Sequence, residues 1–162
     1  MTYAALSVNG DENFREGFTP FLPDCRQTPF NDLESLEREL GRRDVAAFVV
    51  EPIQGKGVNI PAPGYLREAA RLCRRHGAIF IADEVQSGMG RTGRFLAFEH
   101  DGDVDPDIVV LAKTLSGGFV PVAPCCARNG FMRRFFPACS ARWCIVPRSA
   151  RAALRWSPDW QR

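Results

Sequence analysis

Three short apolar runs, each followed at once by a charged residue, constrain the fold of this 162-residue chain more than any other feature. The runs and the residues that follow them are 45–50 with Glu51, 78–82 with Asp83, and 108–112 with Lys113. A continuous apolar run of this length is typical of a strand that is buried on both faces, as in a parallel sheet.

Helical patterns separate these strand-like runs. Residues 64–76 place apolar side chains on one helix face, and Gly77 follows as a stop signal. A shorter helix is expected up to Leu40, with Asn31 or Asp32 as its N-cap and Gly41 as its end. The alternation predicts an α/β fold with a largely parallel sheet. Ligands of such sheets bind beyond the carboxyl ends of the strands, which is where the three charged residues stand.

The two ends of the chain carry weaker patterns. Residues 1–30 are rich in Gly, Pro and Phe and predict irregular structure around a short opening strand. Residues 119–127 predict an extended segment, and 129–136 could begin a helix. The periodic pattern disappears from about residue 138, so we expect one domain over 1–137 and an atypical tail over 138–162.

Composition excludes several classes of protein. A formal charge of +2 gives no reason to expect nucleic acid or an anionic membrane as partner. No apolar stretch approaches the roughly 18 residues of a membrane span, and the first residues lack the features of a signal peptide. We therefore expect a cytoplasmic protein. The six cysteines show no metal-binding spacing and are expected to be free thiols, and no metal site is predicted.

Lys113 and Asp83 suggest chemistry as well as structure. Lys113 is one of only two lysines, and burial at a strand end would favour its neutral amine, which attacks carbonyl groups to form a Schiff base. A pyridine aldehyde cofactor also needs a carboxylate at its ring nitrogen, a role that suits Asp83. Gln86 could donate to the phenolic oxygen of the ring. Spacing alone nevertheless favours the simpler interpretation, an ordinary salt bridge between strand ends.

Three motifs strengthen the chemical interpretation. They are VVEPIQG at 49–55, IADEVQSGMGRTG at 81–93 and LAKTLSGG at 111–118. In order and spacing they resemble class III aminotransferases, the pyridoxal-phosphate enzymes of the ornithine, acetylornithine and 4-aminobutyrate aminotransferase type. The resemblance covers about residues 2–137. It implies part of the large domain of a fold-type-I pyridoxal-phosphate transferase, with a mainly parallel sheet and flanking helices.

The resemblance also implies a role for each site residue. Lys113 would hold pyridoxal 5'-phosphate as an imine and act as the catalytic base, and Asp83 would pair with the pyridinium nitrogen. Val85 would pack on the ring face, Gln86 would reach the phenolic oxygen, and Glu51 would lie close to the cofactor. A complete relative transfers an amino group between an amine or amino acid and a 2-oxo acid, and works as a homodimer.

Some neighbouring residues do not fit a site role. Arg91 and Arg94 suit a loop or an interface better than a substrate contact, and the glycines of 88–93 follow no phosphate-binding fingerprint. Lys56 stands where several ω-amino-acid members have a second glutamate, which puts an ornithine-like or 4-aminobutyrate-like substrate in doubt. Its default role is that of a solvated surface residue.

Several family segments have no counterpart here, among them the turn that grips the cofactor phosphate and the small domain. Charge-assisted hydrogen bonds to a phosphate contribute about 1.5–3 kcal/mol each, so we expect weak cofactor binding and little or no activity from the chain alone. Three possibilities stay open. The chain is part of a transaminase or aminomutase that another chain completes, a catalytically silent truncated or frameshifted remnant, or a small α/β interaction module.

Overall fold

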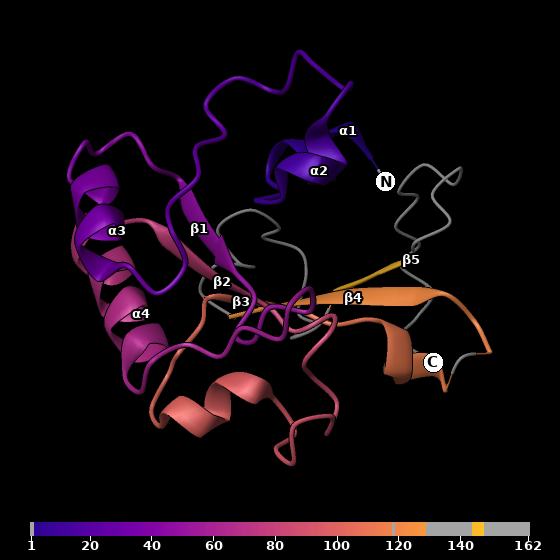
Figure 1. The fold of residues 1–162 in the computed structure, drawn as a ribbon. Helices are drawn as coiled ribbons and strands as arrows, with labels where there is room; N and C mark the ends of the chain where they lie inside the picture. The colour runs from indigo at the N-terminus through magenta and orange to yellow at the C-terminus, as the bar shows by residue number, and fades with distance from the viewer. Residues whose placement is uncertain (1, 118, 129–143, 148–162) are drawn as a thin grey trace.

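The computed structural model describes residues 2–117, 119–128 and 144–147, and its frame within them is a five-stranded sheet (Figure 1). The strands, in sheet order, are β1 (Ala47–Val50), β2 (Ile79–Asp83), β3 (Ile108–Val110), β4 (Val122–Ala127) and β5 (Cys144–Pro147). Strands β1, β2 and β3 run parallel, and β4 and β5 each pair antiparallel with the strand before them. The predicted α/β class is confirmed.

The helices are α1 (Tyr3–Ser7), α2 (Glu12–Arg15), α3 (Leu33–Leu40), α4 (Tyr65–His76) and the short 3₁₀ helices η1 (Ala97–Asp101) and η2 (Lys113–Ser116). Helices α3 and α4 cover one face of this sheet, and α1 and α2 lie apart from them (Figure 1). Helices α3 and α4 lie side by side, and α4 packs against β2 (Figure 1). The short opening strand predicted within residues 1–30 is wrong, because the Thr2 hydroxyl accepts the Ala5 amide at 3.4 Å and begins α1 instead.

The two longer helices begin and end where the sequence predicted, to within a residue. Asp32 caps α3, and its Oδ1 accepts the Ser35 amide at 3.0 Å. Gly64 offers no side chain at the start of α4, so Asp101 from η1 accepts the amides of Gly64 and Arg67 there. Gly77 ends α4 at φ 75°, a left-handed conformation that favours glycine.

The hydrophobic core lies between the sheet and helices α3 and α4. Its most deeply buried side chains include Leu36, Leu40, Leu66, Cys73 and Phe80, none more than 2% exposed. Along β2 the side chains alternate, so Phe80 and Ala82 are buried while Ile79, Ile81 and Asp83 on the opposite face are only half-buried.

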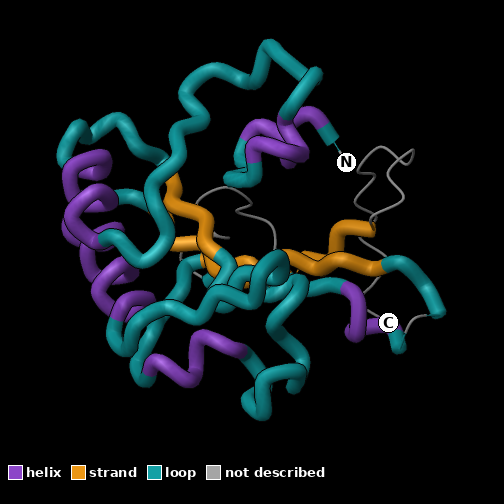
Figure 2. Tube along the Cα trace, viewed as in Figure 1, coloured by secondary structure: helices purple, strands orange, loops and turns teal. Residues whose placement is uncertain are grey.

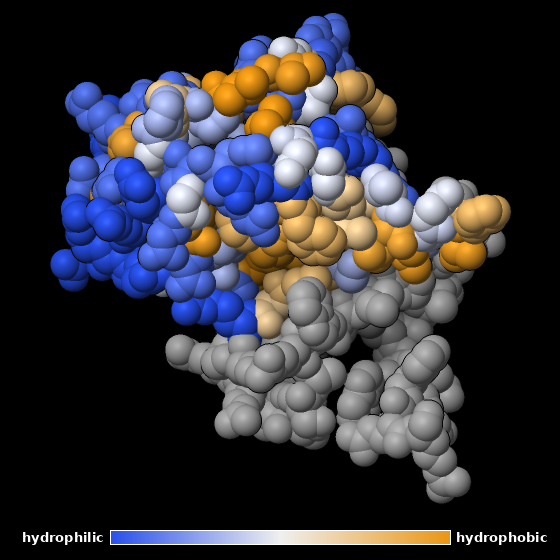
Figure 3. Space-filling model, turned by 90° about the horizontal axis from the view of Figure 1, so that it is seen from below, coloured by the Kyte–Doolittle hydropathy of each residue, from blue (hydrophilic) through white to orange (hydrophobic). Residues whose placement is uncertain are grey.

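The opposite face of β1 is open within the described residues. The expectation that the run at 45–50 is buried on both faces is therefore wrong, because Ala47 is exposed and the Val49 side chain is 44% exposed. Helices α3 and α4 cover only the face that carries Val50 and Phe80. Figure 3 shows polar side chains over the helical side of the molecule and apolar ones over the middle of the face it presents.

Parts of the prediction fall outside the described residues. The helix expected at 129–136 lies there, as does most of the tail. Strand β5 belongs to the tail and pairs with β4, with Cys144 opposite Cys125. The domain boundary at residue 137 stays a prediction. No helix in the described part of the chain is long and apolar enough to cross a membrane.

Truncation of Phe80 should test this packing. Phe80 is 1% exposed and lies on the β2 face that helices α3 and α4 cover, so Phe80→Ala should lower the free energy of unfolding by about 3–5 kcal/mol. Urea denaturation followed by circular dichroism measures the change. Val58→Ala is the control, since this side chain is 68% exposed and its loss should change stability by less than about 0.5 kcal/mol. Equal effects of the two substitutions would contradict the assigned core.

Candidate functional site

The carboxyl ends of β1, β2 and β3 meet at one edge of the sheet, and the loops that follow them gather there (Figure 2). Val50 pairs with Ala82, and Asp83 pairs with Val110. Glu51 and Asp83 therefore stand at the same level on neighbouring strands, and Lys113 follows three residues after Val110. Parallel pairing thus brings together the three strand ends on which the sequence prediction depended.

Lys113 opens η2 and reaches the loop that follows β2. Its Nζ donates a hydrogen bond to Oε1 of Gln86. Its backbone is left-handed, with φ 55°, which costs a residue with a side chain about 1–2 kcal/mol. Strain of this kind concentrates at functional sites. The buried lysine expected from the sequence is wrong for the described chain, because Lys113 is exposed.

Asp83 ends β2 on the face turned away from α3 and α4. Its Oδ1 accepts the Val85 amide at 3.0 Å, which fixes the carboxylate at the strand end. Its second oxygen makes no hydrogen bond within the described part of the chain. A carboxylate held in this way, with one oxygen unengaged, suits a cationic N–H donor from a ligand. Val85 is half-buried beside it.

Glu51 acts on the same site through its own loop. Its Oε2 accepts the Gly55 amide at 2.7 Å and so holds the loop that follows β1. A Cβ atom at residue 55 would lie 2.6 Å from Cγ of Gln86, so only glycine allows this approach. Glu51 thus holds the backbone of Gly55, and Gly55 lies against the side chain of Gln86. The proposed contact of Glu51 with a cofactor stays a prediction.

Arg91 belongs to the loop that carries Gln86. Its Nη1 donates to the backbone carbonyl oxygen of Gln86 at 2.9 Å. The glycine-rich stretch is closed by its own backbone, because the amides of Met89 and Gly90 both donate to the Phe95 carbonyl, at 2.8 and 3.3 Å. These two amides are therefore engaged within the loop.

Sequence reasoning missed the part played by Glu84. Its side chain is 1% exposed, and both carboxylate oxygens accept hydrogen bonds. Oε2 accepts the Ser87 hydroxyl at 2.6 Å, and Oε1 accepts the Phe98 amide at 2.9 Å. The strand alternation was the available signal, since it places the residue after Asp83 on the packed side of the sheet. Its hydrogen-bond partners have no signature in the sequence.

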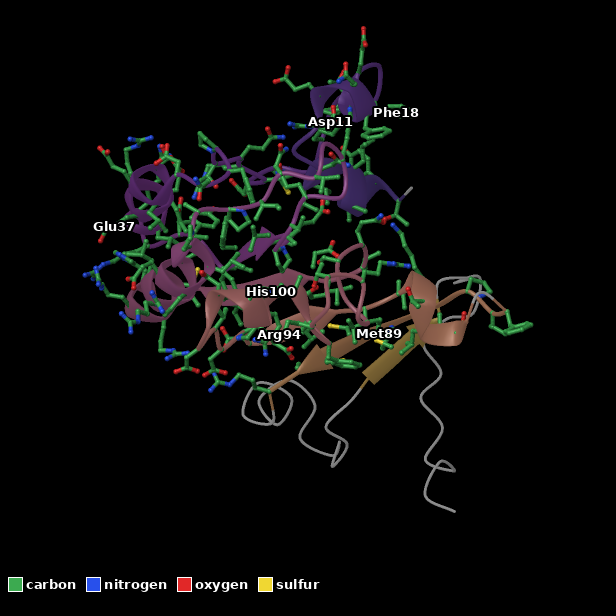
Figure 4. All side chains as sticks on the ribbon, turned by 60° about the horizontal axis from the view of Figure 1, so that its bottom comes forward. Asp11, Phe18, Glu37, Met89, Arg94 and His100 are labelled. Carbon is green, nitrogen blue, oxygen red and sulfur yellow. The ribbon has the colours of Figure 1, made fainter. Side chains whose placement is uncertain are left out.

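Lys56 lies in the loop next to Gly55, and its side chain is 64% exposed, as expected of a solvated surface residue. Its Nζ forms an ion pair with Asp11 and lies 5.0 Å from the centre of the Phe14 ring. The hydrogen bond from Lys56 holds the pKa of the Asp11 carboxyl below its usual range. Figure 4 shows Asp11 and Phe18 on the N-terminal segment, well apart from Met89 in the glycine-rich loop.

Two thiols, Cys73 in α4 and Cys126 in β4, are poor nucleophiles. Burial raises the pKa of Cys73 to about 12 and that of Cys126 to about 11. Among the described residues no cluster of three or more His, Cys, Asp or Glu side chains is arranged to hold a metal ion.

Comparison with known proteins agrees with this geometry. The sequence model of the family "Aminotransferase class-III" matches residues 1–142. Ornithine aminotransferase from Rattus norvegicus is 53% identical over 123 residues, which are 75% of this chain and 28% of the rat protein. Acetylornithine aminotransferase from Methanopyrus kandleri is 50% identical over 137 residues, which are 84% of this chain and 34% of that protein.

A solved structure shows the same fold. Ornithine aminotransferase from Toxoplasma gondii, crystallised with partial occupancy of pyridoxal phosphate at its active site, matches with a TM-score of 0.78 and 43% identity. The match covers 85% of this chain and 32% of the Toxoplasma chain. The chain belongs to the class III aminotransferase family, as the sequence motifs predicted. It spans about a third of the length of these relatives.

Removal of the Lys56 ammonium should change the titration of Asp11. In Lys56→Gln the pKa of Asp11 should rise toward the usual range of an aspartate, although the hydrogen bonds from Asn13 remain. Because the pair lowers the folded-state pKa, its stabilisation is present above about pH 4 and is lost as the pH falls through the lowered value. Carbon NMR titration of the Asp11 carboxyl measures the shift, and an identical pKa in both proteins would refute the ion pair.

Proposed function

We propose that this chain is the lysine-bearing part of a pyridoxal-phosphate-dependent transaminase. The reaction moves an amino group between an amine or amino acid and a 2-oxo acid. The observation that carries the proposal is the hydrogen bond from the Lys113 amine to Gln86, at the sheet edge where β2 ends in Asp83. Relatives named ornithine and acetylornithine aminotransferase support this reaction class.

The side chains present fit pyridoxal 5'-phosphate. The exposed Lys113 amine suits the aldehyde carbon, and the unengaged oxygen of Asp83 suits the protonated ring nitrogen. Gln86 accepts a hydrogen bond from Lys113 and has an amide N–H that would suit the phenolic oxygen, and half-buried Val85 would suit the ring face. Glu51 completes the set as an acidic neighbour that fixes the adjacent loop. When bound, the cofactor supplies an electron sink for the substrate carbon.

The protein's own groups then have distinct tasks. The Lys113 amine would hold the cofactor and, once the substrate amine had taken its place, would carry a proton on Nζ. General acid–base transfer of this kind contributes about 10²–10⁴-fold to a rate. The Asp83 carboxylate would favour the protonated ring nitrogen, because an anion beside a cationic N–H favours the charged form. The Gln86 side chain orients the amine between these events.

The remaining features of the proposal concern partners and location. We propose small-molecule substrates, a homodimer in the whole enzyme, and a cytoplasmic location. The small formal charge of +2 supports the absence of a nucleic-acid or membrane partner.

Trapping of the cofactor on a lysine tests the proposal. The chain offers only two lysine side chains, so incubation with pyridoxal phosphate, reduction with borohydride and peptide mass spectrometry should place the adduct on Lys113. Lys113→Ala should lose that adduct. Lys56→Arg is the matched control, because it removes the other lysine amine, keeps a cation for Asp11, and should label like the native chain.

Labelling that is absent from Lys113, or equal at Lys56 and Lys113, would overturn the proposal. Absence of any lysine adduct would support the silent remnant instead.

A charge-removing substitution at Asp83 should weaken cofactor binding without unfolding the strand end. In Asp83→Asn the side-chain oxygen still accepts the Val85 amide, but the charge that faces the ring nitrogen is gone. A charge-assisted hydrogen bond contributes about 1.5–3 kcal/mol, so the dissociation constant for pyridoxal phosphate should rise about tenfold or more. Titration with detection of the reduced Lys113 adduct measures it. Unchanged affinity would remove Asp83 from the site.

A further inference from the structure

Glu84 points away from the residues that face the cofactor site. Side chains alternate along β2, so Asp83 lies on the open face and Glu84 on the side of the buried Phe80 and Ala82. At 1% exposure the Glu84 carboxylate is out of reach of solvent and of any molecule bound over Asp83. Its function must therefore act through the protein groups that it contacts.

Those contacts close the base of the loop that follows β2. The Glu84 carboxylate accepts the Ser87 hydroxyl at 2.6 Å on one oxygen and the Phe98 amide at 2.9 Å on the other. The loop of residues 88–97 connects Ser87 to Phe98, the two residues that Glu84 contacts. Phe98 also packs against the hydrophobic core. One buried side chain thus fixes both ends of the loop, and Gln86 lies within the turn that it holds.

The backbone of Glu84 joins the same turn to β3, which leads to Lys113. The Glu84 amide donates to the Val110 carbonyl at 2.9 Å, and the Glu84 carbonyl accepts the Gly88 amide at 2.8 Å. A Cβ atom at residue 88 would lie 2.8 Å from the Glu84 carbonyl oxygen and 3.2 Å from Cδ2 of Leu111. The turn and the residue after β3 are therefore in close contact, and there is no space for a side chain at residue 88 between them.

We infer that Glu84 is the positioning residue that sets Gln86 and Asp83 relative to Lys113. Its buried carboxylate fixes the turn from which Gln86 reaches the Lys113 amine, and it does so through hydrogen bonds rather than through its charge. Glutamine can keep both bonds, because its Oε1 accepts the Phe98 amide while its Nε2 donates to the Ser87 hydroxyl. Alanine removes both. The inference deepens the proposed function and rests on it for its effect on cofactor binding.

Titration with pyridoxal phosphate, followed by borohydride reduction and quantitation of the Lys113 adduct, tests this inference. Glu84→Ala should weaken the affinity about tenfold, and Glu84→Gln should stay within about twofold of the native chain. Asp101→Ala is the matched control, because it removes another carboxylate that accepts two backbone amides, but at the start of α4. It should lower the melting temperature and leave the affinity unchanged. An unaffected Glu84→Ala, or a loss as large in Asp101→Ala, would overturn the positioning role.

A second measurement needs no cofactor. In nitrogen-resolved NMR spectra, the Phe98 amide should lose its protection from hydrogen exchange in Glu84→Ala and keep it in Glu84→Gln. The side-chain amide resonances of Gln86 should move to those of a free glutamine only in the alanine variant. If the native chain forms no Lys113 adduct, the proposed function fails while these spectra still decide the positioning role. Unmoved Gln86 resonances in Glu84→Ala would refute it.

Ser87→Ala covers the case in which Glu84→Ala does not fold. This milder substitution removes one of the two donors to the buried carboxylate. It should weaken the affinity for pyridoxal phosphate about threefold and shift the Gln86 side-chain resonances in the same direction. Native affinity together with native Gln86 resonances would overturn the inference.

Discussion

Parallel pairing of β1, β2 and β3 is the constraint on which the rest of the structure depends. The register aligns Val50 with Ala82 and Asp83 with Val110, so residues far apart in sequence reach the same sheet edge. Parallel strands need long crossover connections, and here α4 provides one of them between β1 and β2. The core that α3 and α4 form against Phe80 fixes these strands. A site assembled from strand ends therefore depends on the core that holds those strands together.

The two faces of β2 carry residues with different environments at that sheet edge. Asp83 on the open face is available to a ligand, whereas Glu84 on the packed face holds the turn that follows. The approach of Gly55 to Gln86 brings the loop after β1 into the same arrangement, since any side chain at residue 55 would displace Gln86. Adjacent acidic residues thus have different tasks because strand alternation gives them opposite environments.

Local sequence patterns predicted most helices and strands correctly, but they did not predict which side chains are exposed. The helix ending at Gly77 and the strands ending near Glu51, Asp83 and Lys113 follow from periodicity and stop signals, which are properties of neighbouring residues. The exposure of Val49 and Lys113 does not, because burial depends on which elements cover a face. The helix in place of an opening strand at residues 3–7 shows the same limit, since a Thr2 cap outweighed a weak strand pattern.

The sequence by itself determined the family and the α/β class, and the roles that it assigns to Lys113 and Asp83 stay predictions. Motifs of contiguous residues specify the family and the class, and the match over residues 1–142 bears out the family. Only the tertiary structure decided that Lys113 contacts Gln86, that Glu84 closes the loop through Phe98, and that Lys56 pairs with Asp11. Each of these contacts joins residues that are far apart in the sequence. Which residues meet therefore depends on how strands, helices and loops pack in space.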